Sequence, residues 1–407
     1  MIKVNYKYQK DYIYKYVSCA IKFYHERFSI NGKNVASIEL RKNLPLSYFL
    51  DFILTKPEEF NYKVKLLVEN KSEIIEFYNP ILIYGWLYEM ICSNEMKINS
   101  KSRKSIFNNF FDDVLFQLKQ MKNKDERNLI LLDYFINLMG CCKGEKESKK
   151  KATLKKISVI INRHRPDRDF YTLFPSWILE LSEIFDYNNF MNVDIGYDIN
   201  DKLNISVCPF CNLKNIEPDK KNHGTYRPDL DHFYPKSKYP FFALSLYNLI
   251  PSCDECNRAN KREEDTYLKN CRHPFLSGLN NKKIYEINNI DDLIIFSNYN
   301  DIDGLNIDLS VKINKYKGYE NDIFNIEKRV LDKKDKKYHE KAKNIIKMFM
   351  RSDKGKCYKI GNEELTEEEY ISESCIDLNF DISSLKQVNK KLKVDLVNAI
   401  FKRNDVA

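Results

Sequence analysis

Apolar positions recur at helical spacing through the first half of the chain. Residues 73–95 are apolar and aromatic, and residues 125–140 carry apolar side chains three and four positions apart, up to Gly140. Pro175 stands just before an amphipathic stretch at residues 176–187, as expected of a proline in the first turn of a helix. We therefore predict a mostly helical domain over residues 1–195.

The pattern changes near residue 200. Residues 207–275 are dense in cysteine, proline, histidine and aspartate, a composition typical of a small module held together by a metal. Residues 283–315 contain short β-branched runs (IYEI, LIIF, LSVKI) separated by Asn, Asp and Gly, which predict strands. Residues 324–350 and 382–403 predict helices. The expected division is a helical domain (1–195), a metal-stapled module (200–280) and a mixed, then helical region (281–407).

Charge and hydropathy narrow the class of protein. The 407 residues include 67 Lys and Arg against 58 Asp and Glu, a net charge of +9 that is compatible with a polyanionic partner. Lysine is abundant throughout, so this excess alone identifies no partner. No apolar run reaches the roughly 18 residues that a membrane-spanning helix needs. The first twelve residues lack the apolar core of a signal peptide, and we expect a soluble, cytoplasmic protein with no membrane partner.

Four of the eleven cysteines form two CxxC pairs. Cys208 and Cys211 make the first pair and Cys253 and Cys256 the second, with 41 residues between them. Two such pairs can close a tetrahedral Zn²⁺ site, and four thiolates leave no position open for water. We therefore predict a zinc ion that holds the fold and takes no part in chemistry. The alternative is two unrelated pairs of reduced thiols.

A second group of polar residues lies within and just after this metal-stapled segment. Asp231 and His232 are adjacent, Asn248 follows, and Asn257 comes directly after Cys256. Hydrolysis of a phosphodiester needs an activated water and a cation that neutralises charge on the leaving oxygen. Imidazole, which changes protonation near neutral pH, suits the first task. Asp231 and Asn257 offer the oxygen ligands that Mg²⁺ prefers, which suits the second.

The string DLDHFYPKS, followed by NLIPSCDECNRANK, resembles the HNH (ββα-metal) nucleases, in the subset where two CxxC pairs bind zinc. The third motif position is Asn instead of His, as in the HNH domain of type II CRISPR effectors. The likeness covers about residues 205–275, under a fifth of the chain. It implies a small ββα-metal module in a chain that is mainly α, and α+β overall.

The resemblance also implies roles for individual residues. His232 would be the general base, Asp231 and Asn257 would hold one catalytic Mg²⁺ or Mn²⁺, and Asn248 would pin the loop that orients His232. Each has a structural alternative: Asn248 could cap a turn, Asn257 could cap the following helix, and His232 could serve local structure. The residues expected to meet phosphates are Lys236, Lys238, Arg258 and Lys261.

A weaker likeness is to the nuclease subunit of Septu-type and retron-associated anti-phage systems. Together these resemblances imply an endonuclease that cuts DNA and leaves a 5′ phosphate and a 3′ hydroxyl. The expected substrate is double-stranded DNA. They also imply antiviral defence and a regulatory ATPase partner. Two other functions stay open: a zinc-stapled module that binds or assembles without cutting, and a nuclease that acts on RNA.

Two basic stretches lie outside the module. Residues 143–169 contain ten Lys and Arg and four Asp and Glu, and residues 333–347 are also lysine-rich. We expect them to hold a duplex, although a solvated helix face is the ordinary alternative for such charge runs. His223 and His273 flank the module and are expected at the polar surface.

Overall fold

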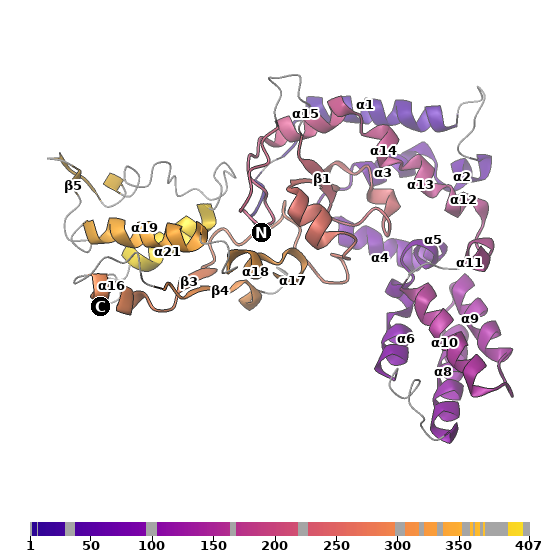
Figure 1. Ribbon diagram of the computed structural model, residues 1–407. Helices are drawn as coiled ribbons and strands as arrows, with labels where there is room; N and C mark the ends of the chain where they lie inside the picture. The colour runs from indigo at the N-terminus through magenta and orange to yellow at the C-terminus, as the bar shows by residue number, and fades with distance from the viewer. Residues whose placement is uncertain are drawn as a thin grey trace. The chain divides into compact units, whose positions relative to one another are not determined.

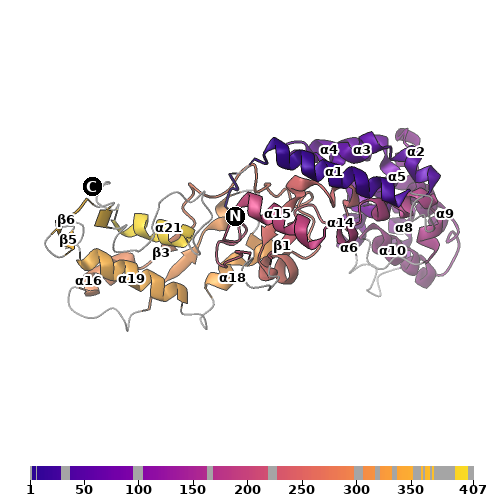
Figure 2. The same cartoon turned by 90° about the horizontal axis from the view of Figure 1, so that it is seen from above.

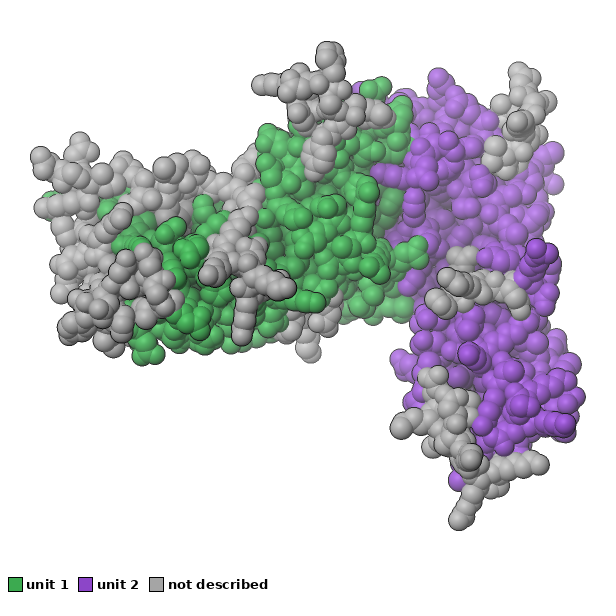
Figure 3. Space-filling model, in the orientation of Figure 1, with its two compact units in different colours: residues 1–13, 191–233, 249–407 green, residues 14–190, 234–248 purple. Residues whose placement is uncertain are grey.

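A computed structural model of the chain describes most of its residues, arranged in two compact units. The described residues are 2–5, 7–28, 37–94, 104–162, 168–218, 227–297, 306–316, 321–331, 337–351, 359–360, 363–366, 369–370 and 390–401. Figure 3 colours the units separately. Unit 1 comprises residues 1–13, 191–233 and 249–407, and unit 2 comprises residues 14–190 and 234–248.

Unit 2 is helical, and its core is rich in aromatic side chains. Its helices are α1 (Lys10–Arg27, which begins in unit 1), α2 (Ile38–Asn43), α3 (Leu46–Ile53), α4 (Phe60–Asn70), α5 (Ser72–Tyr78), α6 (Ile81–Ser93), α8 (Lys104–Lys124), α9 (Ile130–Gly140), α10 (Glu147–Ile161), α11 (Arg168–Thr172), α12 (Ser176–Leu179), α13 (Leu181–Ile184), α14 (Tyr187–Phe190), and the 3₁₀ turns η1 (Pro240–Phe242) and η2 (Leu246–Asn248). Figure 1 shows α8, α9 and α10 side by side.

The segment 234–248 packs among these helices. The Tyr234 ring stacks on Phe60 with ring centroids 5.0 Å apart. The Asn79 amide donates a hydrogen bond to the Tyr239 hydroxyl at 3.0 Å, and the Phe241 ring lies 5.2 Å from that of Phe52. This segment, which separates two strands of unit 1 along the chain, is therefore part of the unit 2 core.

Two of the predicted helices of unit 2 are broken into shorter ones. The apolar stretch at 73–95 forms α5 and α6, because Pro80 has no amide hydrogen to donate and disfavours helical backbone at the preceding residue. Asn79 accordingly has φ −149° and ψ 61°. The stretch at 176–187 begins after Pro175 as predicted, but it divides into α12, α13 and the start of α14.

Unit 1 contains the strands and the second group of helices. Its elements are α15 (Val193–Leu203), β1 (Asp229–His232), β2 (Leu249–Ser252), the π-helix η3 (Glu255–Lys261), β3 (Tyr285–Ile287), α16 (Ile290–Ser297), β4 (Leu309–Val311), η5 (Ile313–Lys315), α17 (Asn321–Phe324), α18 (Ile326–Val330), α19 (Lys337–Arg351), β5 (Lys359–Ile360), β6 (Glu363–Glu364) and α21 (Lys390–Phe401). The strands pair antiparallel as β1–β2, β3–β4 and β5–β6. In Figures 1 and 2, α19 and α21 lie side by side. Between these two helices, the Phe349 ring meets that of Phe401 edge to face.

The region after residue 280 differs in two places from the sequence prediction. The LIIF run, residues 293–296, lies in α16 and not in a strand, since Leu293 N–H donates to the Asn289 carbonyl, and two aspartates in the first turn suit a helix start. The helix predicted over 324–350 is not continuous: Asn325 has a left-handed φ of 48°, α18 ends at Val330 and α19 begins at Lys337, with residues 332–336 outside the described ranges. The strands β3 and β4 form where the sequence predicted them. The last helix, α21, lies within the predicted stretch 382–403, of which residues 382–389 and 402–403 lie outside the described ranges.

The prediction of a mainly helical chain with α+β character is confirmed. Within the described ranges, no helix is both long enough and apolar enough to cross a membrane. The division into domains 1–195, 200–280 and 281–407 stays a prediction.

Candidate functional site

The four CxxC cysteines come together in unit 1. The first pair lies in a tight turn, in which Cys208 N–H donates to the Lys214 carbonyl at 3.1 Å and Ile216 N–H to the Ser206 carbonyl at 2.8 Å. Asn212 closes this turn with a left-handed φ of 57°, a conformation that asparagine tolerates better than most residues. The turn thereby directs both sulfurs of the pair inward.

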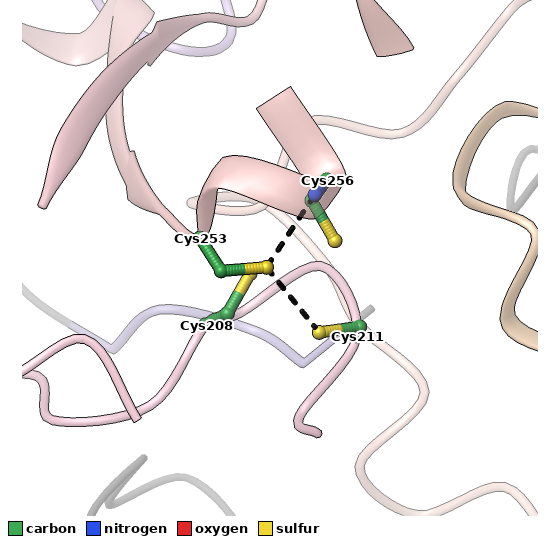
Figure 4. A group of neighbouring side chains, drawn as sticks. All are labelled: Cys208, Cys211, Cys253 and Cys256. Atoms are coloured by element: carbon green, nitrogen blue, oxygen red, sulfur yellow. Dashed lines mark hydrogen bonds between the residues drawn. The ribbon is translucent and has the colours of Figure 1, made fainter. Parts of the chain in front are cut away.

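The second pair joins β2 to the helix η3. Cys253 directly follows β2, Cys256 lies in the first turn of η3, and Cys256 N–H donates to the Cys253 sulfur at 3.4 Å. In the first pair, Leu213 N–H donates in the same way to the Cys211 sulfur at 3.4 Å. Figure 4 shows the four sulfurs grouped between the two turns.

This group has the dimensions of a metal site. All four sulfurs lie within 4.8 Å of one another and all four residues are buried, and the Cys211 and Cys253 sulfurs are 3.9 Å apart. Tetrahedral zinc with Zn–S bonds of about 2.3 Å requires sulfurs about 3.8 Å apart. Hydrogen bonding with the neighbouring thiols, first that of Cys208, lowers the pKa of Cys253 to about 7. The group can hold a structural metal such as zinc.

The strand β1 presents two carboxylates to the helix η3. Side chains alternate along a strand, so Asp229 and Asp231 share one face. The Asp229 carboxylate accepts hydrogen bonds from Arg258 at 2.7 and 2.8 Å and from the Asn257 amide at 3.2 Å. Burial acts against ionisation of Asp229, but the hydrogen bonds from Arg258 and Asn257 outweigh it and lower the pKa of this carboxyl.

Asp231 is paired with a lysine in the interior. One Asp231 carboxylate oxygen lies 3.0 Å from the Lys261 ammonium, and the two side chains are 3% and 1% exposed. The other oxygen, Oδ2, is buried and has no hydrogen-bond partner among the residues that the structure describes. Burial raises the pKa of the Asp231 carboxyl, and the attraction of Lys261 opposes this rise. An unpaired buried carboxylate oxygen is a position where a cation could bind.

Lys261 also fixes the end of β1. Its ammonium donates to the His232 carbonyl at 2.7 Å, in addition to its bond with Asp231. We expected Lys261 to meet phosphates, whereas the structure gives its ammonium these two buried partners. The helix η3 makes this possible, because one wide π-turn separates Asn257 from Lys261 and brings each beside one aspartate of β1.

His232 is the last residue of β1 and pairs with Leu249 across the hairpin. The alternation of side chains directs it to the face opposite Asp231. It is 9% exposed. Its backbone is therefore held on two sides, by β2 through the ladder and by Lys261 through the carbonyl.

Asn248 precedes β2 and holds the segment 234–248. Its side-chain oxygen Oδ1 accepts a hydrogen bond from Tyr234 N–H at 2.7 Å. Its side-chain nitrogen Nδ2 donates to the main-chain carbonyls of Tyr234 and Phe242 at 3.1 and 3.0 Å. The side chain is fully buried. These bonds tie the two ends of the segment 234–248 together, and the role of Asn248 in orienting His232 stays a prediction.

The remaining residues expected to meet phosphates lie nearer the surface. Arg258 is 75% exposed although it bonds Asp229. Lys236 is exposed and stands over the Tyr187 ring at 5.1 Å, and Lys238 is half-buried. Lys236, Lys238 and Asn248 belong to unit 2, and the other predicted site residues belong to unit 1.

The two basic stretches are described in part. On α10, Lys149 and Lys151 form ion pairs with Glu145 and Glu147 one turn earlier. Lys150 is buried and donates to Asn108. Residues 163–167 and 332–336 lie outside the described residues. Ion pairing of this kind is typical of a solvated helix face, and phosphate binding there stays a prediction.

The flanking histidines differ from each other. His273 is buried, 3% exposed, with its ring 4.5 Å from that of Phe233, so the prediction of a surface position was wrong. The neighbouring Pro274 and Phe275 place it in the module core. His223 lies outside the described residues.

Two further side chains, neither of them predicted from the sequence, contact the candidate site. Asp229 stands two residues before Asp231 in DLDH, and strand alternation alone would have placed it on the same face. Arg329 contacts the cysteine group from α18 and has no counterpart in any short motif.

Comparison of the chain with models of protein families, with curated proteins and with solved structures gives no match.

Proposed function

We propose that this chain is a metal-dependent endonuclease of the HNH type that hydrolyses phosphodiester bonds of DNA, with double-stranded DNA as its substrate. The observation that carries the proposal is the order of elements around the cysteine group. The hairpin β1–β2 is followed at once by η3, with Asp231 and His232 at the end of β1 and Asn257 on η3. Two strands followed by a helix, with the four cysteines beside them, support the proposal of a ββα-metal module.

The oxygen donors of this module would hold the catalytic cation. Asp231 and Asn257 are the residues we assign to Mg²⁺ or Mn²⁺, and the unpaired Oδ2 of Asp231 fits this assignment. The cation would supply positive charge that neutralises the leaving 3′ oxygen. The Asp229 carboxylate accepts a hydrogen bond from the Asn257 amide and so orients the Asn257 side chain.

His232 is the group we assign to proton transfer. A neutral imidazole can accept the proton of the attacking water, and its nitrogen then carries it. The fixed backbone at His232, bonded to Lys261 and paired with Leu249, supports this role because a general base needs a defined position. Arg258, Lys236 and Lys238 would meet phosphates of the substrate, and the basic stretches of α10 and α19 would hold the duplex.

Regulation and biological role form the outer part of the proposal. A nuclease of this kind threatens its own host, so we propose a regulatory ATPase partner and a role in anti-phage defence. Both the partner and the role in defence rest on the resemblance of the DHFYPKS and NLIPSCDECN strings to the nuclease subunit of Septu-type and retron-associated anti-phage systems.

A second function has support from one specific observation. One carboxylate oxygen of Asp231 is paired with Lys261, and the Asn257 amide donates to Asp229, so both proposed ligands already bond to protein groups. Such a module could bind nucleic acid or assemble with a partner without cutting. An RNA substrate is the third possibility.

Cleavage assays separate these functions. Supercoiled plasmid, linear duplex and single-stranded RNA are each incubated with the zinc-loaded chain and Mg²⁺, Mn²⁺ or no added cation, with and without a candidate ATPase. We expect nicking of DNA that needs the added cation, falls at least a hundredfold in His232→Ala, and persists in His25→Ala, a change at an exposed histidine of α1. Binding of DNA without nicking in any condition would favour the binding module, and cleavage of RNA alone would change the substrate.

A further inference from the structure

A cation from a distant part of the chain contacts the cysteine group. Arg329, on α18, donates from Nη1 to the Cys256 sulfur at 3.3 Å and approaches the Cys211 sulfur with Nη2 at 3.6 Å. Its Nη2 also donates to the Glu255 carboxylate at 2.8 Å. The side chain is 11% exposed. One guanidinium thus spans one sulfur from each CxxC pair.

The segment that carries Arg329 is fixed onto the module by two further contacts. The Phe324 ring stacks on Phe210, which lies within the first CxxC pair, with centroids 4.5 Å apart and planes at 15°. The Asn325 amide donates to Asn260 of η3 at 2.7 Å. Asn325 itself is left-handed, which turns the chain from α17 into α18. These contacts hold Arg329 in place independently of its charge.

The charges of the group explain why a guanidinium lies there. Four thiolates outweigh the two positive charges of Zn²⁺, so the loaded group is anionic as well as buried. A buried anion is costly unless a counter-charge and hydrogen bonds accompany it. Arginine stays protonated, and its planar fork can donate to two sulfurs and a carboxylate at once, whereas a lysine offers a single point charge.

We propose that Arg329 is a positioning residue of the metal site, an outer cation that retains the zinc and shields the sulfurs of Cys211 and Cys256. The segment of α17 and α18 then belongs to the metal module, although 72 residues separate Arg329 from Cys256. This inference rests on the zinc part of the proposed function and is independent of nuclease activity.

Zinc release from the full chain tests the inference. Zinc-loaded protein is mixed with a colorimetric zinc chelator, and separately with a thiol-modifying mercurial, and the rate of release is followed. We expect Arg329→Gln to release zinc about tenfold faster or more, because loss of an outer partner of a metal ligand typically weakens metal binding about 10- to 100-fold. Arg329→Lys should lie between Gln and wild type. Lys328→Gln removes the same charge from an exposed neighbour and should match wild type.

The outcomes are distinguishable. Wild-type protein that contains no zinc overturns both the zinc assignment and the role of Arg329. Wild-type protein that holds zinc, with Arg329→Gln and Lys328→Gln releasing it equally slowly, overturns only the role of Arg329. Should Arg329→Gln not fold, Arg329→Lys keeps the charge but cannot donate to both sulfurs at once, and it must then release zinc faster than Lys328→Gln.

Discussion

The Lys261 ammonium lies 3.0 Å from a carboxylate oxygen of Asp231, with both side chains almost fully buried. The same ammonium bonds the His232 carbonyl. Lys261 therefore links the carboxylate assigned to the catalytic cation with the backbone of the residue assigned to proton transfer.

Replacement of Lys261 by methionine should destabilise unit 1 strongly. It leaves the Asp231 carboxylate buried without a counter-charge, a change that typically costs about 3 to 5 kcal/mol. Urea unfolding measures the loss. Arg258→Gln breaks a pair with Asp229 whose arginine is 75% exposed, and should cost less than about 1 kcal/mol. Equal losses in the two variants would contradict the buried pair, and a double variant with Asp231→Asn should recover much of the loss.

Asn248→Ala should loosen the segment 234–248. Three hydrogen bonds disappear, and buried backbone groups of Tyr234 and Phe242 lose their partners, so we expect a loss of about 3 kcal/mol. Ser245→Ala, in the same segment, is the control, because the buried Ser245 hydroxyl has no hydrogen-bond partner among the described residues. Its thermal midpoint should stay within a degree or two of wild type. An Asn248→Ala variant with the stability of wild type would contradict the role assigned to Asn248 in this segment.

Cys256→Ser should lose the metal and unfold the hairpin with η3. Binding of structural zinc contributes about 10 kcal/mol or more to folding in small zinc modules. Metal content by mass spectrometry and hydrogen exchange of residues 227–262 are the measurements. Cys271→Ser changes a partly exposed cysteine outside the group and should keep one zinc per chain. Full zinc content in Cys256→Ser would show that the four sulfurs are not the ligands.

Glu76 should make the stability of unit 2 depend on pH. Burial raises the pKa of its carboxyl from 4.5 to about 7, against hydrogen bonds from Tyr84 and from the first amides of α9. A carboxyl with a raised pKa in the folded state contributes most below the unfolded pKa, and this contribution is lost as pH rises towards 7. The shift corresponds to about 3 kcal/mol.

Thermal midpoints between pH 4 and pH 8 test this expectation. Wild type should lose stability across that window, and Glu76→Gln should flatten the profile. Glu73→Gln, on the same helix and only half-buried, should keep the wild-type profile. A slope that survives in Glu76→Gln would assign the pH dependence to another group.

Local patterns predicted the parts of this structure that local chemistry decides. The grouping of Cys208 with Cys211 follows from one short turn, and the start of α12 follows from Pro175. The final helix, α21, and the strands β3 and β4 also follow from periodicity. The LIIF run did not, because a short apolar run fits a strand and a helix equally well and the acidic first turn decided between them.

Contacts between distant residues decided the rest. Lys261 reads as a surface lysine in the sequence, and only the packing of η3 against β1 buries it. Arg329 is 73 residues beyond Cys256, so no spacing rule connects them. The same holds for Glu76, whose carboxylate accepts the amides of Ile130 and Leu131. Such pairings depend on tertiary structure, which periodicity does not encode.

The segment 234–248 has a practical consequence for anyone expressing this protein in pieces. Unit 2 is not an uninterrupted length of chain, since its core includes Tyr234, Tyr239 and Phe241 from beyond residue 190. A fragment that stops at residue 190 would leave the aromatic faces of Phe52 and Phe60 in water, and we expect it to aggregate. Joining residues 234–248 to that fragment through a flexible linker should restore its solubility.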